Sequence, residues 1–150
     1  MNSVELVRII ECLNKLGIVN NYIINDDGTI DVKDNVCLCH KSLTSIPVQF
    51  GVVHGDFDCS FNRLKTLKGS PKFVKGNFNC SNNLLVSLYG APQYVEGSFY
   101  CHDNQLTSLN NITKKINGIL YCYNNKKIFD KEEIQKACSS LSYARIFLAV

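Results

Sequence analysis

The sequence predicts a solenoid of about four to five 21-residue coils, with a parallel β-sheet along one side and a cap at each end. The evidence is a 21-residue period whose units start at Gly55, Gly76, Gly97 and Gly118. Each period repeats a Phe, a Cys, an Asn and a Leu in the same columns. The columns are Phe57, Phe78, Phe99 and Leu120; Cys59, Cys80, Cys101 and Cys122; Asn62, Asn83, Asn104 and Asn125; and Leu64, Leu85 and Leu106. A fixed period of this length is typical of stacked repeats.

The repeat unit reads G-x-F-x-C-x-x-N-x-L-x-x-L-x-G-x-P-x-x-V-x. The Phe and Cys lie two positions apart, which is the spacing of side chains on one buried face of a short strand. The Asn column follows where the chain must turn, and its amide can bond backbone groups of neighbouring coils. The Cys and Asn columns are therefore predicted to form two structural ladders inside the solenoid.

The unit also resembles a known family. Its F-x-C-x-x-N-x-L segment resembles the L-x-L-x-x-N-x-L half of a leucine-rich repeat, and its 21-residue length lies within that family's range. The units GNFNCSNNLLVSLYGAPQYVE and GDFDCSFNRLKTLKGSPKFVK resemble the Cys/Asn repeats of small leucine-rich-repeat proteins from T4-like tailed bacteriophages. The opening NNYIINDDGTIDV, running into LTSIPVQFG, resembles their N-terminal half. The resemblance covers nearly the whole chain, implies a leucine-rich-repeat-like fold and brings no catalytic residues with it.

Residues 1–33 are predicted to form the N-terminal cap. Ser3 can cap a helix from Val4 to about Leu16, and Gly17 is a natural residue to end it. The apolar stripe of this helix is Leu6, Val7, Ile10, Leu13 and Leu16. Two apolar runs follow, and the Asn25-Asp26-Asp27-Gly28 segment between them predicts a β-hairpin over 22–32.

The repeat array is predicted to span residues 34–127, and its first coil is degenerate. Val36 and Leu38 take the Phe and Cys columns, and Lys41 replaces the Asn. This register points Cys37 and Cys39 outward. The alternative is a one-residue slip that places Cys39 in the ladder and turns every neighbouring side chain over. We prefer the unslipped register because three other columns support it, those of Leu43, Ile46 and Val53.

Residues 128–150 are predicted to form a C-terminal helical cap. Asp130 is the expected N-cap, with Glu133 three positions later. Helical spacing continues through Ile134, Ala137, Cys138, Leu141, Ala144, Arg145 and Leu148. The apolar end of the chain, from Ile146 to Val150, is expected to pack onto the last coil. Its alternative role is to contribute to a dimer or partner surface.

Composition narrows the class of protein. At 150 residues the chain is expected to form one domain, and no run approaches the ~20 apolar residues of a membrane span. Residues 1–17 lack a basic start and a cleavage site, so we expect a cytoplasmic protein, in the host cytoplasm if phage-encoded. The eight cysteines lack the paired spacing of a zinc site, and we expect free thiols with no metal and no cofactor.

We expect no enzyme activity. The sequence has no phosphate-binding loop, nucleophile elbow or H-E-x-x-H motif. Its histidines, His40, His54 and His102, fall in different columns. His102 follows Cys101, but neighbours on a strand point to opposite faces, and a Cys–His nucleophile needs both groups within hydrogen-bond reach.

The outward face of the predicted strands is the candidate binding surface. It grades from acidic to aromatic along the array, and parallel strands should align Tyr100 with Tyr121 and His102 with Tyr123. Tyrosine is enriched where proteins bind proteins. The alternative is that these tyrosines are simply good strand formers. The candidate residues are Asp56, Asp58, Asn79, Ser98, Tyr100, His102, Ile119, Tyr121 and Tyr123, with Asn77 beside them.

These patterns favour a non-enzymatic protein-binding module. The phage resemblance implies a host protein as partner, with inhibition or modulation of host defence or regulation as the role. Self-assembly into a homo-oligomer is the alternative, and no membrane partner is expected. Nucleic-acid binding is a weaker alternative because the net charge is only +3. One repeat does contain a cluster of basic residues, but these are expected to be solvent-exposed loop residues. That cluster is Arg63, Lys65, Lys68, Lys72 and Lys75.

Overall fold

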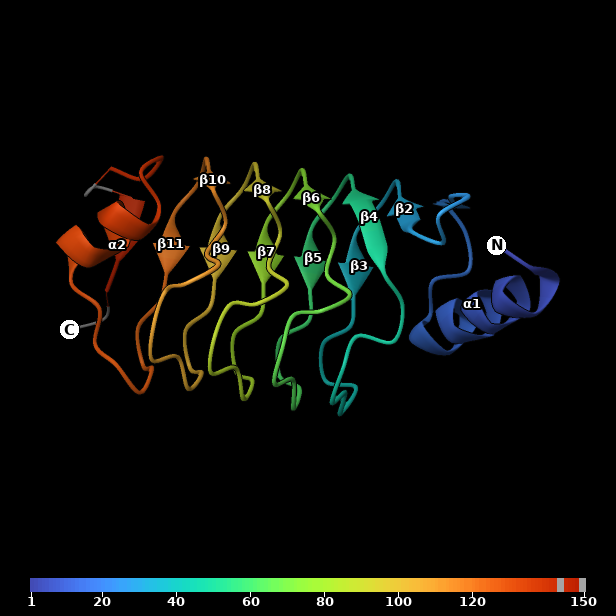
Figure 1. Cartoon of the computed structure of the whole chain (residues 1–150), viewed down its shortest axis with the longest axis horizontal. Coiled ribbons are helices and arrows are strands. Elements are labelled where there is room, and N and C mark those ends of the chain that lie inside the picture. Colours follow the sequence, from blue (N-terminus) through green and yellow to red (C-terminus); the bar gives the residue numbers. More distant parts are fainter. Residues whose placement is uncertain (143–144, 149–150) are drawn as a thin grey trace.

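The structure is a computed structural model that describes residues 1–142 and 145–148. It is a parallel β-solenoid of about four turns of about 21 residues, as the repeat predicted. A helix and a hairpin stand at the N-terminal end, and a second helix stands at the C-terminal end (Figure 1). The two helices α1 and α2 therefore lie at opposite ends of the long axis (Figure 1).

Each coil contributes one strand to each of two sheets. The first sheet, which carries the Phe column, is β3 (Val36–Cys37), β5 (Phe57–Asp58), β7 (Phe78–Asn79), β9 (Phe99–Tyr100), β11 (Leu120–Tyr121) and β12 (Ile146–Phe147). The second sheet is β1 (Tyr22–Ile24), β2 (Ile30–Val32), β4 (Phe50–Val53), β6 (Phe73–Val74), β8 (Tyr94–Val95) and β10 (Lys115–Ile116). Only the antiparallel β1–β2 hairpin, which was predicted, departs from parallel pairing among the pairs described. The sequence had indicated one sheet, and the second is a finding of the structure.

The core lies between the two sheets and is built from the repeat columns. The rings of Phe57 and Phe78 stack at a centroid distance of 5.7 Å, and the Phe99 ring follows 5.0 Å from Phe78 with a tilt of 42°. Val53, Val74, Val95 and Ile116 face them from the second sheet, and all are fully buried. The cysteines of the repeat column are buried beside the rings as free thiols, so they form a ladder inside the solenoid. These cysteines are Cys59, Cys80, Cys101 and Cys122.

The register of the first coil is the unslipped one. Val36 pairs with Phe57 and Cys37 pairs with Asp58. Val36 and Leu38 are accordingly buried, whereas Cys37 is exposed and Cys39 is half-buried. Neither of these two cysteines therefore joins the buried ladder.

The Asn column forms a second ladder, which joins neighbouring coils. The Asn83 amide donates to the carbonyls of Cys59, Cys80 and Ser81 at 3.0–3.2 Å, and its oxygen accepts the Leu64 N–H at 2.9 Å. Asn62, Asn104 and Asn125 repeat this pattern. The residue before each ladder Asn has a positive φ of 49–53°, which makes the turn sharp; these residues are Phe61, Asn82, Asp103 and Asn124.

Replacing a ladder Asn inside the array should destabilise the protein. Asn83→Ala and Asn104→Ala should each lower the free energy of unfolding by about 1–3 kcal/mol, because buried backbone groups lose their partners. Asn62→Ala is the matched control, because Asn62 is only half-buried and water can replace its amide. Urea unfolding measures all three. Equal, negligible losses would show that the turns do not need these bonds.

The N-terminal cap is the helix α1 (Ser3–Leu16), which ends at Gly17 as predicted. The predicted N-cap was wrong by one residue. Asn2 caps the helix, because its side chain accepts the Glu5 N–H while the Glu5 carboxylate accepts the Asn2 N–H. The predicted stripe is correct at its C-terminal end, where Leu13 and Leu16 are buried, but Val7 is exposed. The C-terminal end of the helix lies nearest the coils (Figure 1), and Ile9 and Cys12 also pack against the core.

The C-terminal cap is shorter than predicted. Asp130 caps α2 (Lys131–Ala137) by accepting the Glu133 N–H, as expected, but the helix stops at Ala137. The predicted helical spacing through Leu148 was therefore wrong. Instead Ile146–Phe147 forms β12, which adds a parallel strand beside β11. Ile146 is buried against the last coil, and the predictions for Ala144, Ala149 and Val150 lie outside the described residues.

Candidate interaction surface

The outward side of the first sheet carries two stacked aromatic pairs. Tyr100 pairs in register with Tyr121, and their rings stack at 4.5 Å with an interplanar angle of 6°. His102 and Tyr123 stack in the same way, at 4.5 Å and 9°. These are the two rows expected from parallel register. All four side chains are half-buried, because each ring covers one face of its neighbour.

A fifth ring joins them from β12. Phe147 lies 5.2 Å from Tyr121 and 5.9 Å from Tyr123, measured between ring centroids, and it is 49% exposed. Together these five side chains, Tyr100, His102, Tyr121, Tyr123 and Phe147, form what we call the aromatic face. The sequence placed Phe147 in the apolar end of the chain, whose alternative role was a partner surface, but not beside these rings. One further period from Tyr121 leads to Ser142, so Phe147 stands in no repeat column of the outward face.

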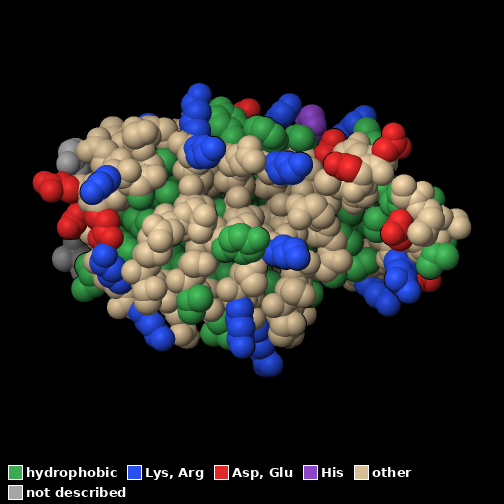
Figure 2. All heavy atoms as spheres, in the orientation of Figure 1, with side chains coloured by type: hydrophobic (Ala, Val, Ile, Leu, Met, Phe, Trp, Pro, Cys, Tyr) green, Lys and Arg blue, Asp and Glu red, His purple; other side chains and the backbone are tan. Residues whose placement is uncertain are grey.

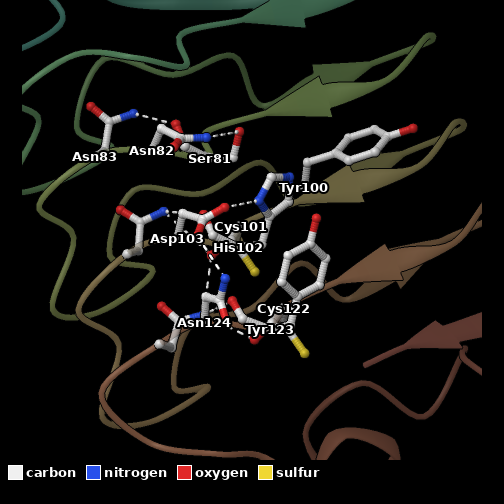
Figure 3. Close-up of polar contacts among 12 residues, drawn as sticks. Ser81, Asn82, Asn83, Tyr100, Cys101, His102, Asp103, Cys122, Tyr123 and Asn124 are labelled. Carbon is white, nitrogen blue, oxygen red and sulfur yellow. Dashed lines mark hydrogen bonds and ion pairs between the residues drawn. The ribbon is translucent and has the colours of Figure 1, made fainter. Parts of the chain in front are cut away.

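A polar network holds one edge of the aromatic face. Nδ1 of His102 lies 2.6 Å from a carboxylate oxygen of Asp103, whose other oxygen accepts the Asn124 amide at 3.0 Å (Figure 3). Partial burial raises the pKa of Asp103, but the hydrogen bonds from His102 and Asn124 outweigh it and leave the pKa below its ordinary value. The network therefore keeps Asp103 ionised and orients the His102 ring. Sequence reasoning missed Asp103.

Asp56 and Ser98, which were predicted to bind a partner, instead hydrogen-bond to the backbone of the next coil. The Asp56 carboxylate accepts the N–H of Asn77 at 2.6 Å, and the Ser98 hydroxyl accepts the N–H of Ile119 at 3.0 Å. Asn35 and Asn77 make the same bond to the coil that follows each of them. This further ladder, the strand-start ladder, joins the beginnings of β3, β5, β7, β9 and β11 in the first sheet. Because their oxygens already have partners, Asp56 and Ser98 belong to the framework beneath the face.

Asp58 and Asn79 are also engaged within their own coils. The Asp58 carboxylate accepts the Ser60 N–H at 2.8 Å, and the Asn79 side-chain oxygen accepts both the N–H and the hydroxyl of Ser81. Ser60 and Ser81 share the column of His102, but they are only 2% exposed. Ile119 is 37% exposed and lies beside Ser98 at the start of its strand. Among the hydrogen bonds of residues 1–142 and 145–148, none involves the hydroxyl of Tyr100, Tyr121 or Tyr123, although His102 is bonded to Asp103.

The thiols nearest the aromatic face point the other way. Cys101 and Cys122 lie in the core, and burial raises the pKa of both thiols, to about 12 for Cys122. A thiol of this kind is a poor nucleophile at neutral pH. Within residues 1–142 and 145–148, no group of three or more His, Cys, Asp or Glu side chains is placed to hold a metal ion. Over the same residues, no helix is long and apolar enough to cross a membrane.

Comparison with known proteins adds no relative. No protein-family model, no curated protein and no solved structure matches the chain. The β-solenoid and its repeat of about 21 residues are thus established by the geometry of the chain itself. The aromatic face is the feature of that geometry from which a function can be inferred.

Proposed function

We propose that this chain is a non-enzymatic protein-binding module and that the aromatic face is its binding surface. One observation carries the proposal: five adjacent rings are held in register on the outer side of a regular sheet, with their outer surfaces open. Adjacent rings on an otherwise polar face are typical of a partner surface.

The chemistry of these side chains suits a protein partner. Tyrosine offers a large ring and one hydroxyl at a small entropic cost, so it is enriched among residues that dominate binding energy. Here the stacking on neighbouring coils and the His102–Asp103 bond fix the rings before any partner arrives. A preorganised surface loses less conformational freedom on binding. The face is therefore suited to tight recognition of a complementary apolar patch that presents hydrogen-bonding groups to the hydroxyls.

The resemblance to leucine-rich-repeat proteins of T4-like phages suggests who the partner is. On that basis we propose a host protein, bound in the host cytoplasm, whose defence or regulatory activity is modulated or inhibited. This step is an analogy from the repeat pattern rather than a deduction from chemistry.

Truncating the aromatic face should remove partner binding. Tyr121→Ala and Tyr123→Ala should each weaken capture of a protein from a bacterial host lysate, and about 30-fold or more is expected in a titration with the isolated partner. Each change removes ring contacts with its neighbours, so we expect a loss of only about 0.5–1.5 kcal/mol of stability. Circular dichroism checks that the variants remain folded.

The matched control is Phe73→Ala, which removes an exposed ring from the second sheet and should leave capture unchanged. Asp56→Ala is unsuitable as a control because it breaks the strand-start ladder. Light scattering tests the self-assembly alternative. If the wild-type protein is an oligomer and Tyr121→Ala dissociates it, the aromatic face binds a second copy of the chain. If the folded tyrosine variants capture the partner as well as the wild-type protein does, the binding surface lies elsewhere.

A further inference from the structure

The second sheet also has an outward face, and its central row is aromatic. Val52 pairs with Phe73, Phe73 with Tyr94, and Tyr94 with Lys115, so these four side chains line up across β4, β6, β8 and β10. The centroids of the Phe73 and Tyr94 rings lie 6.4 Å apart, and Phe73 is 42% exposed. The rings border an open hollow of about 530 Å³, lined by Val52, His54, Phe73, Lys75, Tyr94 and Glu96.

Lysines surround this aromatic row. Lys72 and Lys75 flank β6 in the sequence, and Lys114 and Lys115 come at the matching position one coil beyond Tyr94. All four are exposed, and Nζ of Lys115 lies 5.3 Å from the centre of the Tyr94 ring. Glu96 is the one carboxylate that lines the hollow. Figure 2 shows basic and hydrophobic side chains side by side along the upper margin, above β10 to β4.

A second groove continues the basic surface. It has a volume of about 320 Å³ and runs beside the turns that precede β6 and β8. Its lining includes Lys68, Lys72, Tyr89 and Gln93. Lys72 lines this groove, and its neighbour in the sequence, Phe73, lines the hollow. Lysine and aromatic side chains therefore border both depressions.

We propose that this face, the lysine–aromatic track, binds single-stranded nucleic acid. Cations in a groove with exposed rings between them are the features by which proteins hold single strands, because the lysines neutralise phosphates and the rings stack on bases. The planes of the two rings are inclined to each other by 53°, and Nζ of Lys115 lies over the Tyr94 ring, so Phe73 is the ring more open to a splayed base. Duplex DNA keeps its bases stacked inside and should use only the lysines.

The lysine–aromatic track lies on a different face from the one that carries the proposed function. In the sequence alone, Lys72 and Lys75 fit solvated loop residues. The second sheet gives them a role, because it sets Tyr94 of β8 between β6, which Lys72 and Lys75 flank, and β10, which begins at Lys115. Binding on the track and binding on the aromatic face can therefore be tested separately.

The test is fluorescence anisotropy with end-labelled oligo(dT) and oligo(rU) of about 12 nucleotides, a length of about one such binding site. We expect a micromolar Kd at low salt and a slope of about −3 in a plot of log K against log[salt], from four lysine–phosphate contacts. Phe73→Ala and Tyr94→Ala should each weaken binding about fivefold or more, and Lys72→Glu with Lys75→Glu should nearly abolish it. Tyr94→Phe keeps the ring and should bind as wild type does.

Tyr121→Ala, on the other sheet, should leave oligonucleotide binding unchanged. The proposal is overturned if wild-type protein does not bind either oligonucleotide at low salt. It is also overturned if heparin competes fully while the Phe73 and Tyr94 variants bind normally, since the face would then attract any polyanion. Binding to vesicles of anionic phospholipid in preference to oligonucleotides would identify a membrane surface as the partner instead.

Discussion

Raising the pH above about 9 should unfold this protein steeply. Burial raises the pKa of all four ladder thiols, those of Cys59, Cys80, Cys101 and Cys122, whereas an unfolded Cys ionises near pH ~8.5. A raised folded-state pKa gives stability that is complete below the unfolded pKa and is lost as pH rises. Each thiol then removes about 1.4 kcal/mol of stability per pH unit, or about 5.6 kcal/mol per pH unit for the four thiols together. Against a typical total of about 5–15 kcal/mol, the midpoint should fall near pH ~10–11.

Urea unfolding between pH 7 and 10, in reducing buffer, measures this slope. The double variant Cys80→Ala/Cys101→Ala is the control, because it keeps the coil and removes two of the four titrating groups. Its stability should fall about half as steeply with pH. A protein that stays fully folded well above pH ~11, or a slope that the double variant does not change, would contradict the role of the thiols.

Adding one methyl group at Gly97 should destabilise the array more than any surface change. A Cβ at this position would lie 2.5 Å from the Asn77 side-chain oxygen and 2.6 Å from the Gly76 carbonyl oxygen. Backbone of the preceding coil cannot move aside without breaking its own ladder. We therefore expect Gly97→Ala to lower the free energy of unfolding by about 3 kcal/mol or more, measured by urea unfolding.

Gly17→Ala is the control that distinguishes the effect of steric crowding at Gly97 from the effect of backbone strain at a glycine. Gly17 has a φ of +86°, but nothing lies within 4 Å of a Cβ built there. Its replacement should cost only the strain of a left-handed residue, about 1 kcal/mol. If Gly97→Ala were no worse than Gly17→Ala, the coils would be able to move apart, and the glycine column would not be set by close stacking.

The sequence was most informative where each coil repeats the same residue. Phe57, Phe78 and Phe99 recur at a fixed interval, so the register of the first sheet and the stacked aromatic pairs followed from counting. The second sheet was hidden although its strands are as long as those of the first sheet, because only its buried column, Val53, Val74 and Val95, repeats one residue type. The residue that points outward from this sheet also differs in every coil, from Val to Phe to Tyr to Lys, so no repeated residue type marked the row in the sequence.

The C-terminal part was hidden for another reason. The period ends after Asn125, and the residues one period before Ile146 and Phe147 are Asn125 and Lys126, which share neither their size nor their polarity. The seven-residue spacing of Ile134, Leu141 and Leu148 suits a helix instead. The structure shows that pairing with β11 outweighs this local pattern. Phe147 could therefore join the aromatic face only through a tertiary contact that no local signal encodes.

The way each coil bonds only to its neighbours has a consequence for how fast the chain folds. The ladder bonds of Asn83 and Asp56 join residues 19–24 positions apart in a chain of 150. Every coil therefore closes a loop of the same modest length, and no step must wait for the two ends of the chain to meet. Folding can begin at any adjacent pair of coils and spread in both directions. Among proteins built mainly of β-strands, which fold slowly when their contacts are distant, such a chain should be one of the faster ones.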